Sequence, residues 1–244
     1  MSDKKRTYTG VGLPYVDLSD IKGKLIVIEG TDGVGRSTQI EGLKKWLEEK
    51  GYGVITTGWA RSPLMKNAIK EAKEGHSLNV NTFGLLYAAD FADRLEHQII
   101  PALKSGFIVL ADRYIYTAFA RDVIRGADRK WIKKVFGFAL QPDVVFYMKI
   151  DIENLIPRVI TTETLNQHYW EDQAGEGMDY RESGMDMKLG DDFYDSFVEY
   201  QKRILAEFDI MAREFNFQVV DASKGYRFIN RKLREATLAV LAES

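Results

Sequence analysis

The chain has 244 residues, of which 45% are apolar and 29% charged, proportions typical of a globular protein. A net charge of −2 provides no overall positive field for nucleic acid, so we expect no nucleic-acid partner. The chain has no cysteine, which excludes disulfides, thiolate catalysis and cysteine-ligated metal. No apolar run approaches the roughly 18 residues of a membrane span, and the N-terminus carries no apolar signal core. We therefore expect a cytoplasmic protein with no membrane partner.

The order of polar and apolar segments predicts one α/β domain over residues 23–244, preceded by a polar, aperiodic extension at residues 1–22. Short apolar runs rich in β-branched residues predict five strands, at residues 25–28, 54–57, 107–111, 144–150 and 217–220. Apolar residues at helical spacing predict helices at residues 37–49, 63–73, 82–104 (interrupted near Pro101), 116–125, 129–140, 154–160, 193–215 and 227–241. Residues 168–192 hold four glycines and many acids and predict a mobile loop. The alternation predicts a three-layer α/β/α fold with a five-stranded parallel sheet.

A glycine-rich segment follows the first predicted strand and opens the first predicted helix. Its sequence, GTDGVGRS over residues 30–37, fits the pattern G-x-x-x-x-G-[KR]-[ST] of a phosphate-binding P-loop. Glycines let the backbone curl so that its N–H groups point at phosphate oxygens, and the helix N-terminus adds a positive dipole end. We call residues 30–38 the phosphate loop. The residues expected to bind ATP phosphates are Gly30, Gly33, Val34, Gly35, Arg36, Ser37 and Thr38.

Arg36 departs from the P-loop pattern, which has lysine at this position. Lysine is a compact point charge, whereas arginine is a longer, planar fork, so the two are not interchangeable. One hypothesis is that Arg36 bridges the β- and γ-phosphates and acts in catalysis. The other is that it binds ATP in a geometry that is poor for transfer. Ser37 is the expected Mg²⁺ ligand in the loop.

Several further segments, in order along the chain, resemble the thymidylate kinase family of P-loop nucleoside monophosphate kinases. They are EGTDGVGRSTQ (29–39), LYAAD (86–90), IPAL (100–103), DRY (112–114), QPD (141–143) and VDAS (220–223). The resemblance extends from about residue 22 to the end of the chain. It implies a P-loop NTPase-type fold, a homodimer, and phosphoryl transfer from ATP with Mg²⁺ to dTMP.

The resemblance also suggests roles for individual residues. Asp112 ends a strand where a carboxylate can hold Mg²⁺ through water, and Arg113 beside it can meet the acceptor phosphate. Asp32 lies where the family has an acid that meets the acceptor sugar hydroxyl and a phosphate-binding arginine. Arg61 follows the second strand, where the family binds the acceptor phosphate. Tyr87 lies where the family stacks an aromatic ring on thymine.

The predicted acceptor pocket departs from the family pattern. The family's base-contacting arginine falls on Phe91, and Arg94, on the same helical face, is the candidate replacement. The family's Tyr-Gln pair falls on Arg121 and Asp122, and we expect Arg121 to bind the acceptor. These changes of charge put the identity of the acceptor in question more than the type of reaction.

The predicted lid, at about residues 161–192, is long and acidic. Related enzymes with a glycine at the position of Gly33 bring arginines from the lid to the transferring phosphoryl group. Arg158, just before the lid, and Arg181 within it are the candidates for that role.

Three functional hypotheses follow. The leading one is a kinase that makes dTDP from dTMP and ATP. The second keeps the reaction but changes the acceptor to another nucleotide or a nucleoside, because of Phe91, Arg121 and Asp122. The third is a catalytically weak, regulatory nucleotide-binding protein, because of Arg36 and the cation-poor lid.

Overall fold

The computed structural model describes residues 6–75, 78–165 and 184–242. It contains a five-stranded, all-parallel sheet in the order β2-β3-β1-β4-β5. The strands are β1 (Lys24–Glu29), β2 (Val54–Gly58), β3 (Ile108–Asp112), β4 (Val144–Lys149) and β5 (Gln218–Asp221). All five strands predicted from the apolar runs are present, and the fold class is confirmed.

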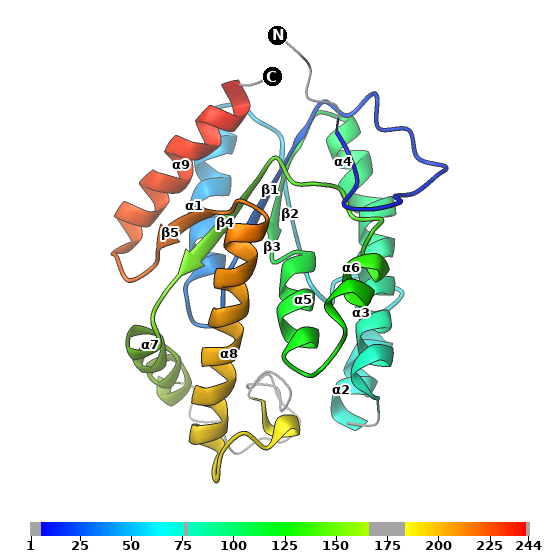
Figure 1. Cartoon of the computed structure of the whole chain (residues 1–244). Helices are drawn as coiled ribbons and strands as arrows, with labels where there is room; N and C mark the ends of the chain where they lie inside the picture. Colours follow the sequence, from blue (N-terminus) through cyan, green and yellow to red (C-terminus); the bar gives the residue numbers. More distant parts are fainter. Residues whose placement is uncertain (1–5, 76–77, 166–183, 243–244) are drawn as a thin grey trace.

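Helices connect the strands and pack on both faces of the sheet (Figure 1). They are α1 (Arg36–Glu49), α2 (Lys66–Gly75), α3 (Val80–Arg94), α4 (Ile100–Lys104), α5 (Ile115–Val123), α6 (Arg129–Val135), α7 (Ile152–Leu165), α8 (Phe193–Glu214) and α9 (Tyr226–Ala242). The helix predicted to end at residue 160 continues to Leu165, into the first part of the predicted lid. The remainder of that lid up to residue 183 lies outside the described residues, and a short 3₁₀ turn, Met185–Met187, follows it.

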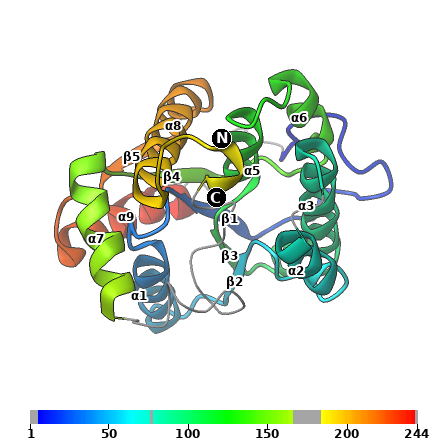
Figure 2. The same cartoon turned by 90° about the horizontal axis from the view of Figure 1, so that it is seen from below.

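Alternate side chains of β1 point into two separate cores, as expected for a strand covered on both faces. Leu25 and Val27 belong to the core beneath α3, α5 and α8, whereas Ile26 and Ile28 belong to the core beneath α1, α7 and α9. Figure 2 shows α1 and α9 on one side of the sheet and α5 and α8 on the other. The three-layer arrangement therefore follows from the apolar run of β1.

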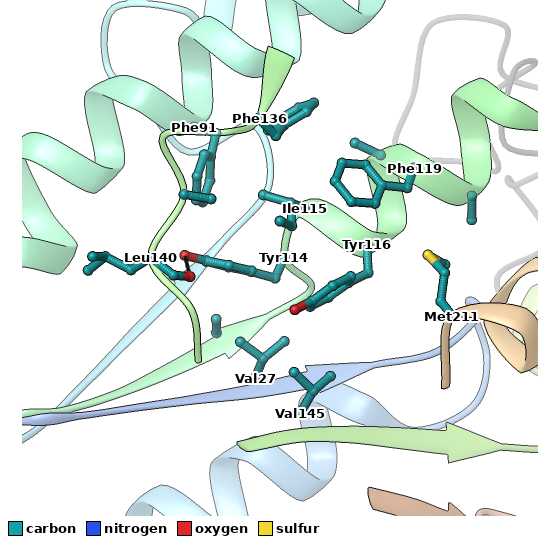
Figure 3. Packing of buried hydrophobic residues seen from close by; sticks show 14 of the residues in the cluster. Val27, Phe91, Tyr114, Ile115, Tyr116, Phe119, Phe136, Leu140, Val145 and Met211 are labelled. Atoms are coloured by element: carbon teal, nitrogen blue, oxygen red, sulfur yellow. Dashed lines mark hydrogen bonds between the residues drawn. The ribbon is translucent and has the colours of Figure 1, made fainter. Parts of the chain in front are cut away.

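Aromatic rings fill the core on the α5 side of the sheet (Figure 3). The ring of Tyr114 lies edge-on to Phe91, with 4.9 Å between centroids, and its hydroxyl donates to the carbonyl oxygen of Leu140 at 2.9 Å. Phe91 is fully buried there. The position that the resemblance aligns with a base-contacting arginine is therefore part of this aromatic core.

The helix predicted over residues 82–104 is interrupted, as expected near Pro101. A π-helical turn, Leu95–Ile99, separates α3 from α4, and Pro101 falls in the first turn of α4. Proline has no N–H to donate within a helix and its ring crowds the carbonyl four residues earlier, so a break in the regular ladder precedes it.

The segment before β1 is tied to the domain. Arg6 donates to Asp143 at 2.6 Å and to the carbonyl oxygen of Gly23 at 3.0 Å, and Tyr8 forms an isolated bridge with Leu140. None of the helices in the described part of the chain is long and apolar enough to cross a membrane.

Candidate active site

The phosphate loop connects the carboxyl end of β1 to α1, beside the carboxyl end of β3, where ligands bind in open parallel sheets. Gly35 is the N-cap residue of α1 and has a φ of 90°, which a side chain would strain. Gly33 has a φ of 75°, and a Cβ added there would lie 2.6 Å from a Val159 methyl group on α7. The loop therefore depends on glycine for both its curvature and its fit against α7.

Arg36 is 8% exposed and extends beneath the loop. Its Nη1 donates to the carbonyl oxygens of Gly30, at 2.6 Å, and Thr31. Its Nε donates to Asp112 Oδ1 at 2.8 Å, and Asp32 Oδ1 lies 3.4 Å from its Nη2. The guanidinium thus holds the loop from within and links it to the end of β3.

Ser37 and Asp112, the two predicted metal ligands, are in contact. The Ser37 hydroxyl donates to Asp112 Oδ2 at 3.2 Å. A hydroxyl and a carboxylate are the hard oxygen donors that Mg²⁺ prefers, so the two residues fit the ion. Since Asp112 Oδ1 already accepts from Arg36, a metal ligated by Asp112 competes with that arginine.

Asp32 lies among three guanidinium groups. Its Oδ1 accepts from Arg113, its Oδ2 is 3.7 Å from Arg121, and Arg36 approaches from the loop side. Burial opposes ionisation, but Arg113, Arg36 and Arg121 hold the pKa of the Asp32 carboxyl well below its usual range. The negative charge inside the phosphate loop is therefore compensated, and it orients two arginines toward the loop.

Arg113 has a φ of 69°, a left-handed conformation that costs a non-glycine residue on the order of 1 kcal/mol. Its N–H donates to the carbonyl oxygen of Ile28 at 3.0 Å, and the N–H of the following Tyr114 donates to Glu29 at 2.7 Å. Contacts with the end of β1 therefore hold Arg113 in this conformation beside Asp32.

Glu29 is a fully buried carboxyl group at the end of β1. It accepts from the N–H of Tyr114 and from the N–H and hydroxyl of Thr117, and so caps the N-terminus of α5 from another element. Burial raises the pKa of Glu29 to about 7, against the lowering effect of these hydrogen bonds and of Arg36 and Arg113. Sequence reasoning gave this residue no role, because its partner helix begins far along the chain.

A pocket that is open to solvent, the aromatic pocket, lies beside α3 and α5. Its lining residues are Trp59, Lys73, Phe83, Tyr87, Thr117, Ala118, Arg121, Asp122, Arg125 and Tyr200. Tyr87 packs edge-on against Trp59 and Phe83, with centroids 5.3 and 5.1 Å apart. The predicted residues Tyr87 and Arg121 therefore line one pocket. Phe83 was missed although it lies four residues from Tyr87 on one helical face, a spacing that would have indicated it.

A second, smaller cavity, the junction cavity, lies between the aromatic pocket and the phosphate loop. Gly30, Asp32 and Arg113 line it on the loop side. Thr117, Arg121 and Tyr200 line both cavities. A ligand in the aromatic pocket therefore has a route, past Arg121 and Arg113, to a phosphate held by the loop.

The other predicted site residues occupy different surroundings. Arg61 is exposed, with its guanidinium against Gly58 at the end of β2. Arg94 is 4% exposed and is outside the lining of the aromatic pocket. It donates to Asp90 at 2.9 Å and to Thr57 at 3.1 Å. Asp90 in turn accepts from the N–H of Ser62 at 2.9 Å, so Arg94 supports the segment that carries Trp59 and Arg61.

Of the two arginines predicted to act from the lid side, the structure describes Arg158. Arg158 on α7 is 3.4 Å from the carbonyl oxygen of Ser223, in the turn after β5. Arg181 lies outside the described residues.

Comparison with known proteins identifies the family. A family model described as thymidylate kinase matches residues 28–175. The chain is 36% identical over 216 residues to the probable thymidylate kinase 2 of Saccharolobus solfataricus, an alignment that covers 88% of this chain and 95% of the relative. The chain belongs to the thymidylate kinase family. It is also 29% identical over 221 residues to the probable thymidylate kinase of Thermococcus gammatolerans, covering 86% of this chain and 94% of that one.

A third relative is the thymidylate kinase of Caldicellulosiruptor saccharolyticus, 34% identical over 145 residues, which cover 57% of this chain and 70% of the relative. As a thymidylate kinase family member, the chain is a nucleoside monophosphate kinase of the P-loop class. The family assignment favours the dTMP kinase hypothesis over both alternatives, the kinase of a different acceptor and the regulatory nucleotide-binding protein.

Proposed function

We propose that the enzyme transfers the γ-phosphoryl group of ATP to dTMP and releases dTDP and ADP. One observation carries the proposal: the aromatic pocket joins the phosphate loop through a cavity lined by Arg113 and Arg121. A kinase must hold two phosphates in line and neutralise the charge between them, and this arrangement suits both tasks.

The donor triphosphate binds to backbone N–H groups of the phosphate loop and to the N-terminus of α1, at Gly30, Gly33, Val34, Gly35, Arg36, Ser37 and Thr38. Arg36 adds the positive charge that the loop requires in place of lysine. Ser37 and Asp112, the latter through water, would hold Mg²⁺. Held there, the ion would supply positive charge that neutralises the donor phosphates.

The acceptor base lies in the aromatic pocket, with Tyr87 against its face. The acceptor phosphate enters the junction cavity, where Arg113 and Arg121 meet it and Arg61 approaches from the end of β2. Asp32 orients Arg113 and Arg121 and accepts from the acceptor sugar hydroxyl. We propose that Arg94 contributes by supporting the wall of the pocket behind Trp59, a contact consistent with its guanidinium lying 5.6 Å from that ring's centroid.

In the transfer, an oxygen of the acceptor phosphate forms a bond to the γ-phosphorus of ATP. The bond between that phosphorus and the β–γ bridging oxygen breaks, and ADP leaves with the electron pair. Arg36 and Arg113 neutralise the charge that spreads over the equatorial and bridging oxygens. Arg158 and Arg181 remain proposed as cations that approach from the lid side.

We further propose that the enzyme acts as a cytoplasmic homodimer. The large exposed apolar side chains Leu64, before α2, and Leu85, on α3, are 73% and 51% exposed and would supply apolar area to such an interface. Light scattering during size-exclusion chromatography tests this, with twice the mass of one chain expected and the mass of one chain contradicting it.

A coupled ADP-release assay across dTMP, dUMP, dCMP, dGMP and thymidine tests the proposed acceptor. The highest kcat/KM should belong to dTMP. A higher value for another acceptor would retain the kinase and replace its substrate, and no turnover of dTMP at millimolar concentration would overturn the proposal.

A further inference from the structure

An ion pair between a largely buried arginine and an aspartate that reaches the surface connects the end of α5 to the turn that precedes α8. Arg125, just after α5, is 7% exposed, and its Nε and Nη2 donate to the two carboxylate oxygens of Asp186 at 2.8 and 3.1 Å. Two hydrogen bonds between one guanidinium and one carboxylate fix both the distance between the two side chains and their relative orientation. The pair joins two segments that are remote in sequence, and Arg125 itself lines the aromatic pocket.

The same guanidinium holds two residues that line both cavities. Its Nη1 donates to the carbonyl oxygen of Arg121 at 3.0 Å and to the hydroxyl of Tyr200 at 3.3 Å. Its centre lies 5.1 Å from the centroid of the Tyr200 ring, within range of a cation–π contact. Arg125 therefore touches the backbone of one junction residue and the ring of the other.

The turn that carries Asp186 is itself docked on α8. Gly184 has a φ of 73°, and a Cβ added there would lie 2.6 Å from Tyr200, so the turn is in close contact with that ring. The buried hydroxyl of Ser196 donates to the carbonyl oxygen of Gly184 at 3.1 Å. The backbone that carries Asp186 is therefore held in place by its contacts with α8.

We propose that Arg125 is a positioning residue for the acceptor, and that its ion pair with Asp186 sets the shape of the pocket where the nucleoside monophosphate binds. The inference rests on the proposed function of the aromatic pocket. Arg125 acts through Tyr200 and Arg121, which face the junction cavity. Arg36 supports the donor site independently of this pair. Loss of the Arg125–Asp186 ion pair therefore weakens binding of the acceptor far more than binding of ATP.

Steady-state kinetics of Arg125→Gln and Asp186→Ala tests this proposal. Each change removes a charge-assisted, two-point contact, and we expect KM for the acceptor to rise on the order of tenfold. KM for ATP should stay within about twofold and kcat should fall less than KM rises, because the phosphate loop is untouched. Arg125→Lys, which keeps the charge but loses the fork, should give an intermediate KM.

The double variant measures whether the two residues act as one unit. Arg125→Gln combined with Asp186→Ala should raise the acceptor KM no further than either change alone, since each single change already breaks the ion pair. A matched control is Arg203→Gln, which removes the same charge from an exposed pair with Glu199 on α8 and should leave KM unchanged. Thermal melting of every variant separates a change in the pocket from a loss of fold.

The outcomes distinguish this proposal from the proposed function. Turnover by the wild-type enzyme across the acceptor panel tests the function, and the variants are then compared with whichever acceptor the wild type prefers. A lower melting temperature with an unchanged acceptor KM in both single variants would reduce the pair to a structural contact and overturn the inference. So would equal increases in KM for ATP and for the acceptor, or additive effects in the double variant.

Discussion

Replacing Arg36 with lysine asks whether the phosphate loop is built for arginine. Arg36 donates from Nη1 to two loop carbonyls and from Nε to Asp112, two different nitrogen atoms of one rigid fork. A lysine has one nitrogen, which can serve the carbonyls but cannot also reach Asp112 in the same position. Arg36→Lys therefore loses one charge-assisted hydrogen bond, worth about 1.5–3 kcal/mol.

This loss has three consequences: Mg²⁺ binds more readily, the transfer is slower and the metal-free protein is less stable. Without Arg36 on its Oδ1, Asp112 is more available to Mg²⁺, and the Mg²⁺ concentration for half-maximal activity should fall roughly tenfold, the factor that 1.4 kcal/mol represents. At saturating Mg²⁺, kcat should fall on the order of tenfold, because the shorter cation is misplaced in a loop shaped by arginine. The free energy of unfolding without metal should fall by about 1.5–3 kcal/mol.

The assay is ADP release at saturating dTMP over a Mg²⁺ titration, with urea unfolding of the metal-free protein alongside it. Arg203→Lys is the matched control, because it makes the same exchange in an exposed ion pair on α8. A kcat that rises in Arg36→Lys would refute the reasoning, since it would mean that arginine impairs the loop. An unchanged Mg²⁺ requirement would refute the competition for Asp112.

Three further predictions concern Asp32, Glu29 and Tyr87. Asp32→Asn removes the charge that orients Arg113 and Arg121, and kcat should fall on the order of a hundredfold; the melting temperature should also fall, because largely buried guanidinium groups lose their counter-charge, and retained kcat would contradict this. Because the pKa of Glu29 is raised to about 7 in the folded state from 4.5, the folded protein binds this proton more tightly and the group costs stability as pH rises from about 4.5 to 7. Glu29→Gln should therefore gain about 3 kcal/mol relative to wild type between pH 5 and pH 8 in urea unfolding, and parallel stability curves would contradict it. Tyr87→Leu should raise KM for dTMP on the order of tenfold, with KM for ATP unchanged; an equal effect on both would place the ring outside the acceptor pocket.

The sheet and the phosphate loop were predictable because their signals are local. Each strand is a short apolar run, and β1 leads directly into glycines that only a tight strand-to-helix turn requires. Predicted helix ends were less accurate, as where α7 continues to Leu165 and α6 stops at Val135. Gly137 follows the C-cap residue of α6 and is a local stop signal there, whereas no glycine or proline marks residue 160 and packing decides how far α7 continues.

Site residues were predictable only where their place in the sequence, next to a strand end, determines their place in the fold. Asp32, Arg36 and Arg113 lie next to strand ends, so their convergence follows from a parallel sheet. The side-chain partners of Arg36 and the place of Tyr200 in both cavities depend on how distant elements pack. The position of Arg94 illustrates the limit: its spacing on α3 puts it near the expected face, but Asp90 and Thr57 hold its guanidinium behind the pocket.

The most direct test of the account is to follow the phosphoryl group itself. The enzyme is incubated with Mg²⁺, dTMP and ATP labelled in its γ-phosphoryl group, and the products are separated by chromatography. The account predicts that the label moves into dTDP in step with ADP formation, and that Arg113→Gln suppresses this transfer by about a hundredfold or more. Label that remains in ATP, or that appears only as inorganic phosphate, would contradict the central claim that the two cavities form one phosphoryl-transfer site.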